Sequence, residues 1–148
     1  MSAPLALPEH HSIPPHRRLA PLLAVAAARV LASRRPGRLR SVLEFLRRGA
    51  PPATADQALE ARRAIVSVSL RCAGQACLQR SIAVALLCRF RGVWPTWCTG
   101  VRTSPFAAHA WIEVAGRPIG EPVPAGHYRP LLVVPPATGS SQKAHRSA

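Results

Sequence analysis

Acidic residues are scarce in this sequence of 148 residues, which has 6 Asp and Glu against 20 Lys and Arg and a formal net charge of +14. An imbalance of this size favours polyanions, acidic peptides or acidic proteins as partners. Basic and aromatic residues do not alternate, and no RNA-binding motif is present, so nucleic acid is not the expected partner. The basic residues instead form Arg doublets on segments that we expect to be helical, at 17–18, 34–35, 47–48 and 62–63.

A CxxC pair is also missing. The four cysteines are separated by 5, 11 and 10 residues, at Cys72, Cys77, Cys88 and Cys98. These spacings do not fit a zinc module, and four cysteines in a chain of this length do not make a dense disulfide framework. We therefore expect reduced thiols, a cytoplasmic protein, and neither a metal nor another cofactor.

The sequence has no apolar run long enough to cross a bilayer. Two arginines precede an apolar stretch at 19–32, as in a targeting signal, but Arg29 interrupts the stretch. We interpret this stretch as an amphipathic helix and expect no membrane association. Apolar residues with helical spacing predict which face of it turns to the core, namely Leu19, Leu22, Leu23, Ala26 and Val30.

Composition divides the chain into two arms and one domain. Residues 1–16 are rich in Pro and His without periodicity, which predicts a flexible arm. Residues 135–148 are poor in hydrophobic side chains, which predicts a disordered tail. The domain is therefore expected at 17–134, a length that supports a single core. We expect no metal site in the first arm, although it holds three histidines, His10, His11 and His16.

Helical signals fill the first half of the domain. Pro36 and Gly37 break the chain before a second helix, and Thr54 with Gln57 three residues later fits a capping box that opens a third. The core stripe predicted for the second helix is Leu39, Val42, Leu43 and Leu46. The stripe predicted for the third is Leu59, Val66 and Leu70.

The segment from Cys77 to Phe90 differs from these helices because it is apolar on every side from Ile82 to Cys88. This pattern is typical of a buried central helix, and Gly92 ends it. Strand-like segments follow at 94–101, 106–114, 117–121 and 128–134. Helices followed by strands indicate an α+β fold, in which N-terminal helices and the buried helix pack on a small antiparallel sheet.

Cys77 is the first residue of the predicted central helix. Helix N-termini carry unpaired N–H groups and the positive end of the helix dipole, which stabilise a thiolate and an oxyanion. Cys77 is therefore a candidate nucleophile for attack on a carbonyl, with Gln75 or a nearby amide as a second oxyanion donor. The alternative is a small buried thiol, which is the role that we expect for Cys88 and Cys98.

His109 lies in an alternating run that predicts a strand, on the same face as Glu113. Glu113 is about 13 Å away along a strand, too far to orient the imidazole. A three-residue hairpin loop at 114–116, with Gly116 left-handed, would place Glu121 opposite His109 with about 5 Å between their Cβ atoms. A two-residue loop would turn Glu121 to the other face, and without a thiol nearby His109 would be an ordinary sheet histidine.

Two segments carry a resemblance to a known family. They are CLQRSIAVALLCRFRG at 77–92 and TGVRTSPFAAHAWIEVAGRPIGEP at 99–122. Together they resemble the split leader peptidases of lasso-peptide biosynthesis, within the transglutaminase-like superfamily. The resemblance implies a papain-like cysteine protease in which Cys77 is the nucleophile and His109 the base. Glu121 matches a position that usually holds Asp, one methylene shorter.

The resemblance also implies the partners. The substrate would be the leader region of a ribosomally made precursor, bound by a separate leader-recognition protein, and the core would pass to a separate ATP-using lasso cyclase. Two alternatives stay open from the residues alone. One is a basic binding module for nucleic acid or protein, without catalysis. The other is a transglutaminase-like acyl transfer in which an amine replaces water, since both reactions share a thioester.

Overall fold

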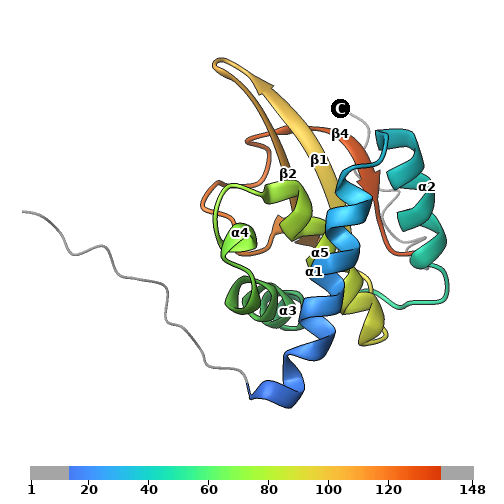
Figure 1. The fold of residues 1–148 in the computed structure, drawn as a ribbon. Helices are drawn as coiled ribbons and strands as arrows, with labels where there is room; N and C mark the ends of the chain where they lie inside the picture. Colours follow the sequence, from blue (N-terminus) through green and yellow to red (C-terminus); the bar gives the residue numbers. More distant parts are fainter. Residues whose placement is uncertain (1–13, 138–148) are drawn as a thin grey trace, which may run out of the picture.

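A computed structural model describes residues 14–137 of the chain. The first half is helical, and the predicted order of helices before strands is confirmed (Figure 1). The helical elements are η1 (Pro15–Arg17), α1 (Leu19–Ala32), α2 (Pro36–Leu46), α3 (Ala55–Val68), α4 (Leu70–Ala73) and α5 (Cys77–Phe90). The strands are β1 (Thr96–Thr103), β2 (Phe106–Val114), β3 (Arg117–Pro118) and β4 (Arg129–Val134).

The four strands form one antiparallel sheet in the order β3-β2-β1-β4. The β1–β2 hairpin extends beyond the helices, and α2 lies beside β4 (Figure 1). Helix α5 packs on α1, α3 and β2, so it stands between the other helices and the sheet. The predicted α+β fold, with a buried helix on a small antiparallel sheet, is confirmed.

Helix α5 is the centre of the core, as its apolar sequence predicts. Every residue from Ile82 to Cys88 is buried or nearly so. A hydrogen bond inside the core joins α5 to the sheet, because Trp97 Nε1 donates to Ser81 Oγ at 3.0 Å. The polar groups that α5 buries are concentrated in its first turns, next to Cys77.

The capping box that opens α3 is confirmed. Gln57 N–H donates to Thr54 Oγ1 at 3.2 Å, and Thr54 N–H donates to Gln57 Oε1 at 2.9 Å. Two donors at the helix start are thereby satisfied, which fixes where α3 begins. The stripe predicted for this helix is correct at Leu59, which packs against the core, and wrong at Leu70, which lies outside α3 and is 86% exposed. The residues that α3 buries are Ala58, Ala61, Ala64 and Ile65.

The predicted core face of α1 is also wrong. The apolar residues assigned to the core are exposed: Leu19, Leu22, Leu23, Ala26 and Val30. Helix α1 instead buries Pro21, Ala24 and Ala28 against α5 and α3. Small side chains let two helix backbones approach closely, so the alanine face packs against the central helix and the leucine face is left outside. The stripe of α2 is correct at its centre, since Leu39 and Leu43 are buried.

The turn between β2 and β3 differs from the predicted three-residue loop. It has two residues, Ala115 and Gly116, with φ of 52° and 77°, as a type I′ hairpin requires. The strand register is therefore Glu113 opposite Pro118, and not opposite Arg117. This turn type is not expected from the residues at 115–116, because an alanine with positive φ is uncommon.

The predicted arms lie mostly outside the described residues. Residues 1–13 of the N-terminal arm and 138–148 of the C-terminal tail fall there. Pro15 and His16, assigned to the arm, begin the short helix η1. Within residues 14–137, no helix is both long enough and apolar enough to cross a membrane.

Candidate active site

Cys77 is the first residue of α5, as predicted, and it is partly exposed. The other three cysteines, Cys72, Cys88 and Cys98, are buried. No side chain caps the helix start, because the N-cap residue is Ala76. The positive end of the helix dipole therefore faces the thiol without a competing carboxylate. The Cys77 N–H itself donates to the Gln75 carbonyl at 2.9 Å.

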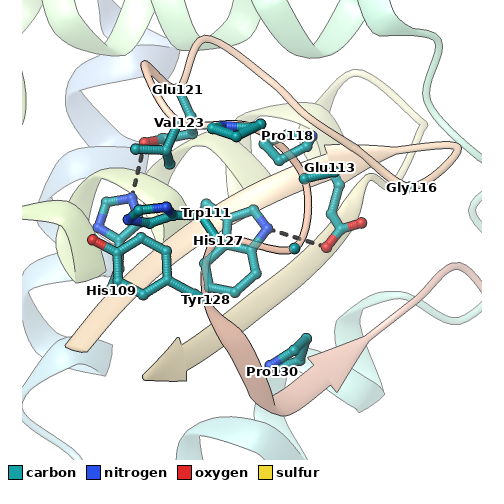
Figure 2. A pocket seen from close by; sticks show the side chains of 13 residues that line it. His109, Trp111, Glu113, Gly116, Pro118, Glu121, Val123, His127, Tyr128 and Pro130 are labelled. Atoms are coloured by element: carbon teal, nitrogen blue, oxygen red, sulfur yellow. Dashed lines mark hydrogen bonds and ion pairs between the residues drawn. The ribbon is translucent and has the colours of Figure 1, made fainter. Parts of the chain in front are cut away.

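His109 and Glu121 form the closest polar contact of the site. The Nε2 atom of His109 lies 2.8 Å from Oε2 of Glu121, and the Glu121 side chain is only 5% exposed (Figure 2). A buried carboxylate at this distance accepts a hydrogen bond from Nε2–H and fixes the ring in one orientation. The Nδ1 atom is then the acceptor, and in the described part of the chain it makes no hydrogen bond.

Glu121 reaches His109 although the register predicted for it is wrong. Strand β3 ends at Pro118, and Gly120 adopts φ of 66°, so the chain leaves the pleat before Glu121. Arg62 of α3 holds the new path, since its Nη2 donates to the Gly120 carbonyl at 2.8 Å. A Cβ at position 120 would collide with the Arg62 side chain. The left-handed backbone conformation favours glycine at this position, and a larger residue would also displace the Arg62 side chain.

Arg80 joins the start of α5 to this carboxylate. Its Nη1 donates to the carbonyls of Cys72 at 3.1 Å and Gly74 at 2.9 Å, which belong to the turn before Cys77. Its Nη2 lies 4.0 Å from Oε1 of Glu121, and the Arg80 side chain is 10% exposed. Residues three apart share a helix face, so the guanidinium places Cys77 and the His109–Glu121 pair in one neighbourhood.

The structure does not bring all three predicted residues into direct contact. Within residues 14–137, no hydrogen bond joins Cys77 Sγ to His109 or to Glu121. Gln75, named as a second oxyanion donor, has an exposed side chain and contributes its backbone carbonyl. Catalytic hydrogen bonds are often long before substrate binds, so the missing contact does not exclude Cys77 and His109 as partners.

Two aromatic rings lie next to the imidazole of His109. The Tyr128 ring centroid lies 5.1 Å from that of His109, and Trp111 stacks at 6.0 Å with an interplanar angle of 10°. Gly100 lies opposite His109 on β1, where a Cβ would collide with the Arg129 carbonyl. The rings form one wall of a cavity of about 200 Å³ (Figure 2).

Glu113 does not orient His109, as predicted, and its hydrogen bonds are to other residues. Its Oε1 accepts hydrogen bonds from Trp111 Nε1 at 3.1 Å and from the Cys98 thiol at 3.0 Å. Burial, followed by this hydrogen bond to the carboxylate, raises the pKa of Cys98. Burial raises the pKa of the Cys88 thiol from 9.0 to about 12. Both thiols are therefore kept protonated and are unsuited to nucleophilic attack.

The sequence matches the family model of the transglutaminase-like superfamily over residues 21–133. The match covers the central helix, the hairpin and the residues of the site. The chain belongs to the transglutaminase-like superfamily. This superfamily includes cysteine proteases and acyl transferases. A search of curated proteins found no match, and a search of solved structures found none either.

Sequence reasoning missed two members of the site, Arg80 and Tyr128. Arg80 stands inside the quoted segment CLQRS, so a buried arginine in an otherwise apolar helix was the available signal. Tyr128 had none, because only folding brings it to His109. Among residues 14–137, no three His, Cys, Asp or Glu side chains are grouped so that they could hold a metal ion.

Proposed function

We propose that this protein is a cysteine protease that removes the leader from a ribosomally made lasso-peptide precursor, with Cys77, His109 and Glu121 as its catalytic residues. The observation that carries the proposal is the 2.8 Å contact between His109 and the buried Glu121 carboxylate. An imidazole oriented in this way, beside the start of the helix that presents Cys77, is the arrangement that thiol acyl transfer requires.

The reaction proceeds through a thioester. His109 Nδ1 takes the proton from Cys77, and Sγ attacks the carbonyl carbon of the scissile bond. The resulting imidazolium, stabilised by Glu121, returns the proton to the leaving amine. Water then attacks the thioester with His109 as base, which releases the leader carboxylate and regenerates the thiol. In this mechanism, substrate binding brings Cys77 and His109 within hydrogen-bonding distance.

Oxyanion stabilisation is assigned to the first turn of α5. The Cys77 N–H is already engaged with the Gln75 carbonyl. The Gln79 Nε2 atom is buried and has no hydrogen-bond acceptor within the described residues. A buried unpaired donor costs free energy unless a ligand uses it. Gln79 is two positions from Cys77, and residues two apart do not share a helix face, so the oxyanion donors of this proposal are the backbone N–H groups of the first turn of α5.

The lasso-peptide substrate is supported by the segments at 77–92 and 99–122. Their resemblance is to split leader peptidases, so the proposal includes a separate leader-recognition protein and a separate ATP-using cyclase. The net charge of +14 favours encounter with acidic surfaces of the precursor or its carrier. Binding should therefore weaken as ionic strength rises.

The proposal is tested by incubating the full chain with a lasso precursor and its recognition protein, followed by mass spectrometry of the products. The expected products are one leader and one core, with one ¹⁸O incorporated at the leader carboxylate in labelled water. Cys77→Ala is the matched control. An intact precursor, or a leader joined to an amine in place of water, would contradict the protease and in the second case favour acyl transfer.

A further inference from the structure

The cavity beside His109 has an unusual charge for this protein. Two of the six acidic residues of the chain, Glu113 and Glu121, line it, whereas no Lys or Arg among residues 14–137 does. It lies between the β2–β3 hairpin and the segment from Glu121 to Pro130 (Figure 2). A strongly basic chain has thus formed an acidic pocket next to its candidate catalytic base.

The Glu113 carboxylate has no cationic partner among the residues that the structure describes. Both hydrogen bonds to its Oε1 come from neutral donors, the Trp111 indole and the Cys98 thiol. Glu121 differs, because it holds His109 and lies near Arg80. Glu113 is therefore the carboxylate of this cavity whose negative charge is not balanced by a described cation, so it can attract a cationic ligand.

The remaining polar lining adds no positive charge that would oppose this. His127 Nε2 lies 2.8 Å from Arg102 Nη1. Because a guanidinium can only donate, the imidazole accepts at this nitrogen and is neutral. Arg102 itself lies outside the lining, 5.8 Å from the Tyr128 ring centroid. The rings of Trp111 and Tyr128, whose centroids lie 5.9 Å apart, complete the lining.

We propose that this cavity binds a Lys or Arg side chain of the peptide substrate, with Glu113 as its counter-ion and Trp111 and Tyr128 as aromatic walls. Aromatic faces and a carboxylate together favour an ammonium or guanidinium group over a neutral side chain. The assignment to the substrate rests on the proposed function, since His109 lines the same cavity. The cavity of about 200 Å³ fits a single side chain.

The test measures binding without catalysis. In the Cys77→Ala chain, ¹⁵N-labelled on tryptophan, the Nε1–H resonance of Trp111 is followed during titration with N-acetyl-lysine methylamide. N-acetyl-norleucine methylamide is the neutral ligand of matched shape. Trp94 and Trp97 are fully buried and serve as internal references. The lysine ligand should shift the Trp111 resonance alone, and the norleucine ligand should shift it at least about tenfold less at equal concentration.

Glu113→Gln is the informative variant, because the amide oxygen keeps both hydrogen bonds while the charge is lost. It should weaken lysine binding roughly tenfold, whereas Glu60→Gln on exposed α3 should not. Circular dichroism of each variant checks that it folds. Equal shifts from both ligands, no shift from lysine, or undiminished binding by Glu113→Gln would each overturn the proposal.

A cleavage assay keeps this result separate from the proposed function. Precursors in which each basic residue near the scissile bond is changed to norleucine are compared with the parent. Lysine binding without cleavage of any precursor would support the lysine-binding pocket and contradict the proposed protease function. Cleavage that is unaffected at every changed position would keep the protease and reject the pocket as a substrate site.

Discussion

Arg80 and Glu121 are 41 positions apart in the sequence, yet the guanidinium Nη2 lies 4.0 Å from the carboxylate Oε1, and both side chains are nearly buried. The same arginine binds the carbonyls of Cys72 and Gly74. It thereby ties the turn before the nucleophile to the carboxylate that orients the base. Arg80 is in this sense a positioning residue.

Replacing Arg80 tests this role. Arg80→Met should lower the free energy of unfolding by about 1–3 kcal/mol, because the buried Cys72 carbonyl and the partly buried Gly74 carbonyl lose their donor. It should also lower kcat with little change in KM, since the geometry of the reacting groups is affected and not substrate binding. Arg80→Lys should recover part of the loss. Urea denaturation and steady-state cleavage measure both effects.

Arg63→Met on the exposed side of α3 is the matched control and should change neither quantity. An Arg80→Met chain that loses stability while kcat stays normal would make the arginine purely structural.

Glu121→Gln should preserve the fold and reduce kcat roughly 10⁴-fold, because an amide cannot stabilise the imidazolium and favours the wrong tautomer. Glu121→Asp shortens the side chain that reaches His109 from the bend at Gly120, so it should retain only part of the activity. Mass spectrometry of precursor cleavage gives both rates. Glu44→Gln, at an exposed ion pair with Arg40, is the control. Normal turnover by Glu121→Gln would reduce the site to a Cys77–His109 dyad.

Alkylation should distinguish Cys77 from the other thiols. Cys77 is partly exposed, whereas Cys72, Cys88 and Cys98 are buried. Iodoacetamide near pH 7 should therefore modify one thiol first, and peptide mapping should locate it at Cys77. The Cys77→Ser chain should lose this rapid modification and all cleavage while keeping the fold. Rapid modification at a different cysteine, or cleavage by Cys77→Ser, would contradict the assignment of the nucleophile.

Gln79→Met should leave kcat unchanged, because Gln79 is two positions from Cys77 and does not share its face of α5. The same change should leave the stability unchanged or higher, because it removes a buried donor without a partner in the described structure. Thermal unfolding and cleavage rates measure these two quantities. A loss of kcat of about 10²–10³-fold would instead identify the buried amide as the oxyanion donor.

Stability should fall at alkaline pH. The pKa of Cys88 is raised to about 12 in the folded state, so the folded chain holds this proton after the unfolded chain has lost it. Stability is fully present below about pH 9 and is lost as pH rises toward 12, by about 1.4 kcal/mol per pH unit for this thiol. Urea unfolding at several pH values should show a shallower slope for Cys88→Ala. Equal slopes would show that Cys88 does not titrate differently in the two states.

The sequence alone determined the parts of this protein that depend on local pattern. An all-apolar segment identifies α5 as the central helix, a capping box fixes the start of α3, and alternation identifies β2. Cys77 at a helix start and His109 on a strand follow from these patterns directly. Burial and periodicity are recorded locally along the chain, so these features needed no tertiary information.

Tertiary packing decided the rest. The alanines of α1 face the core, because a close approach to α5 needs small side chains and leucines are too large for it. The contact between Glu121 and His109 depends on a left-handed bend at Gly120 and on Arg62, which lies 58 positions earlier and holds that bend. The pairing of the two residues was predicted from a register that does not occur. A turn type and a side chain from a distant helix determine where a carboxylate ends up, and neither is written in the spacing of the residues around it.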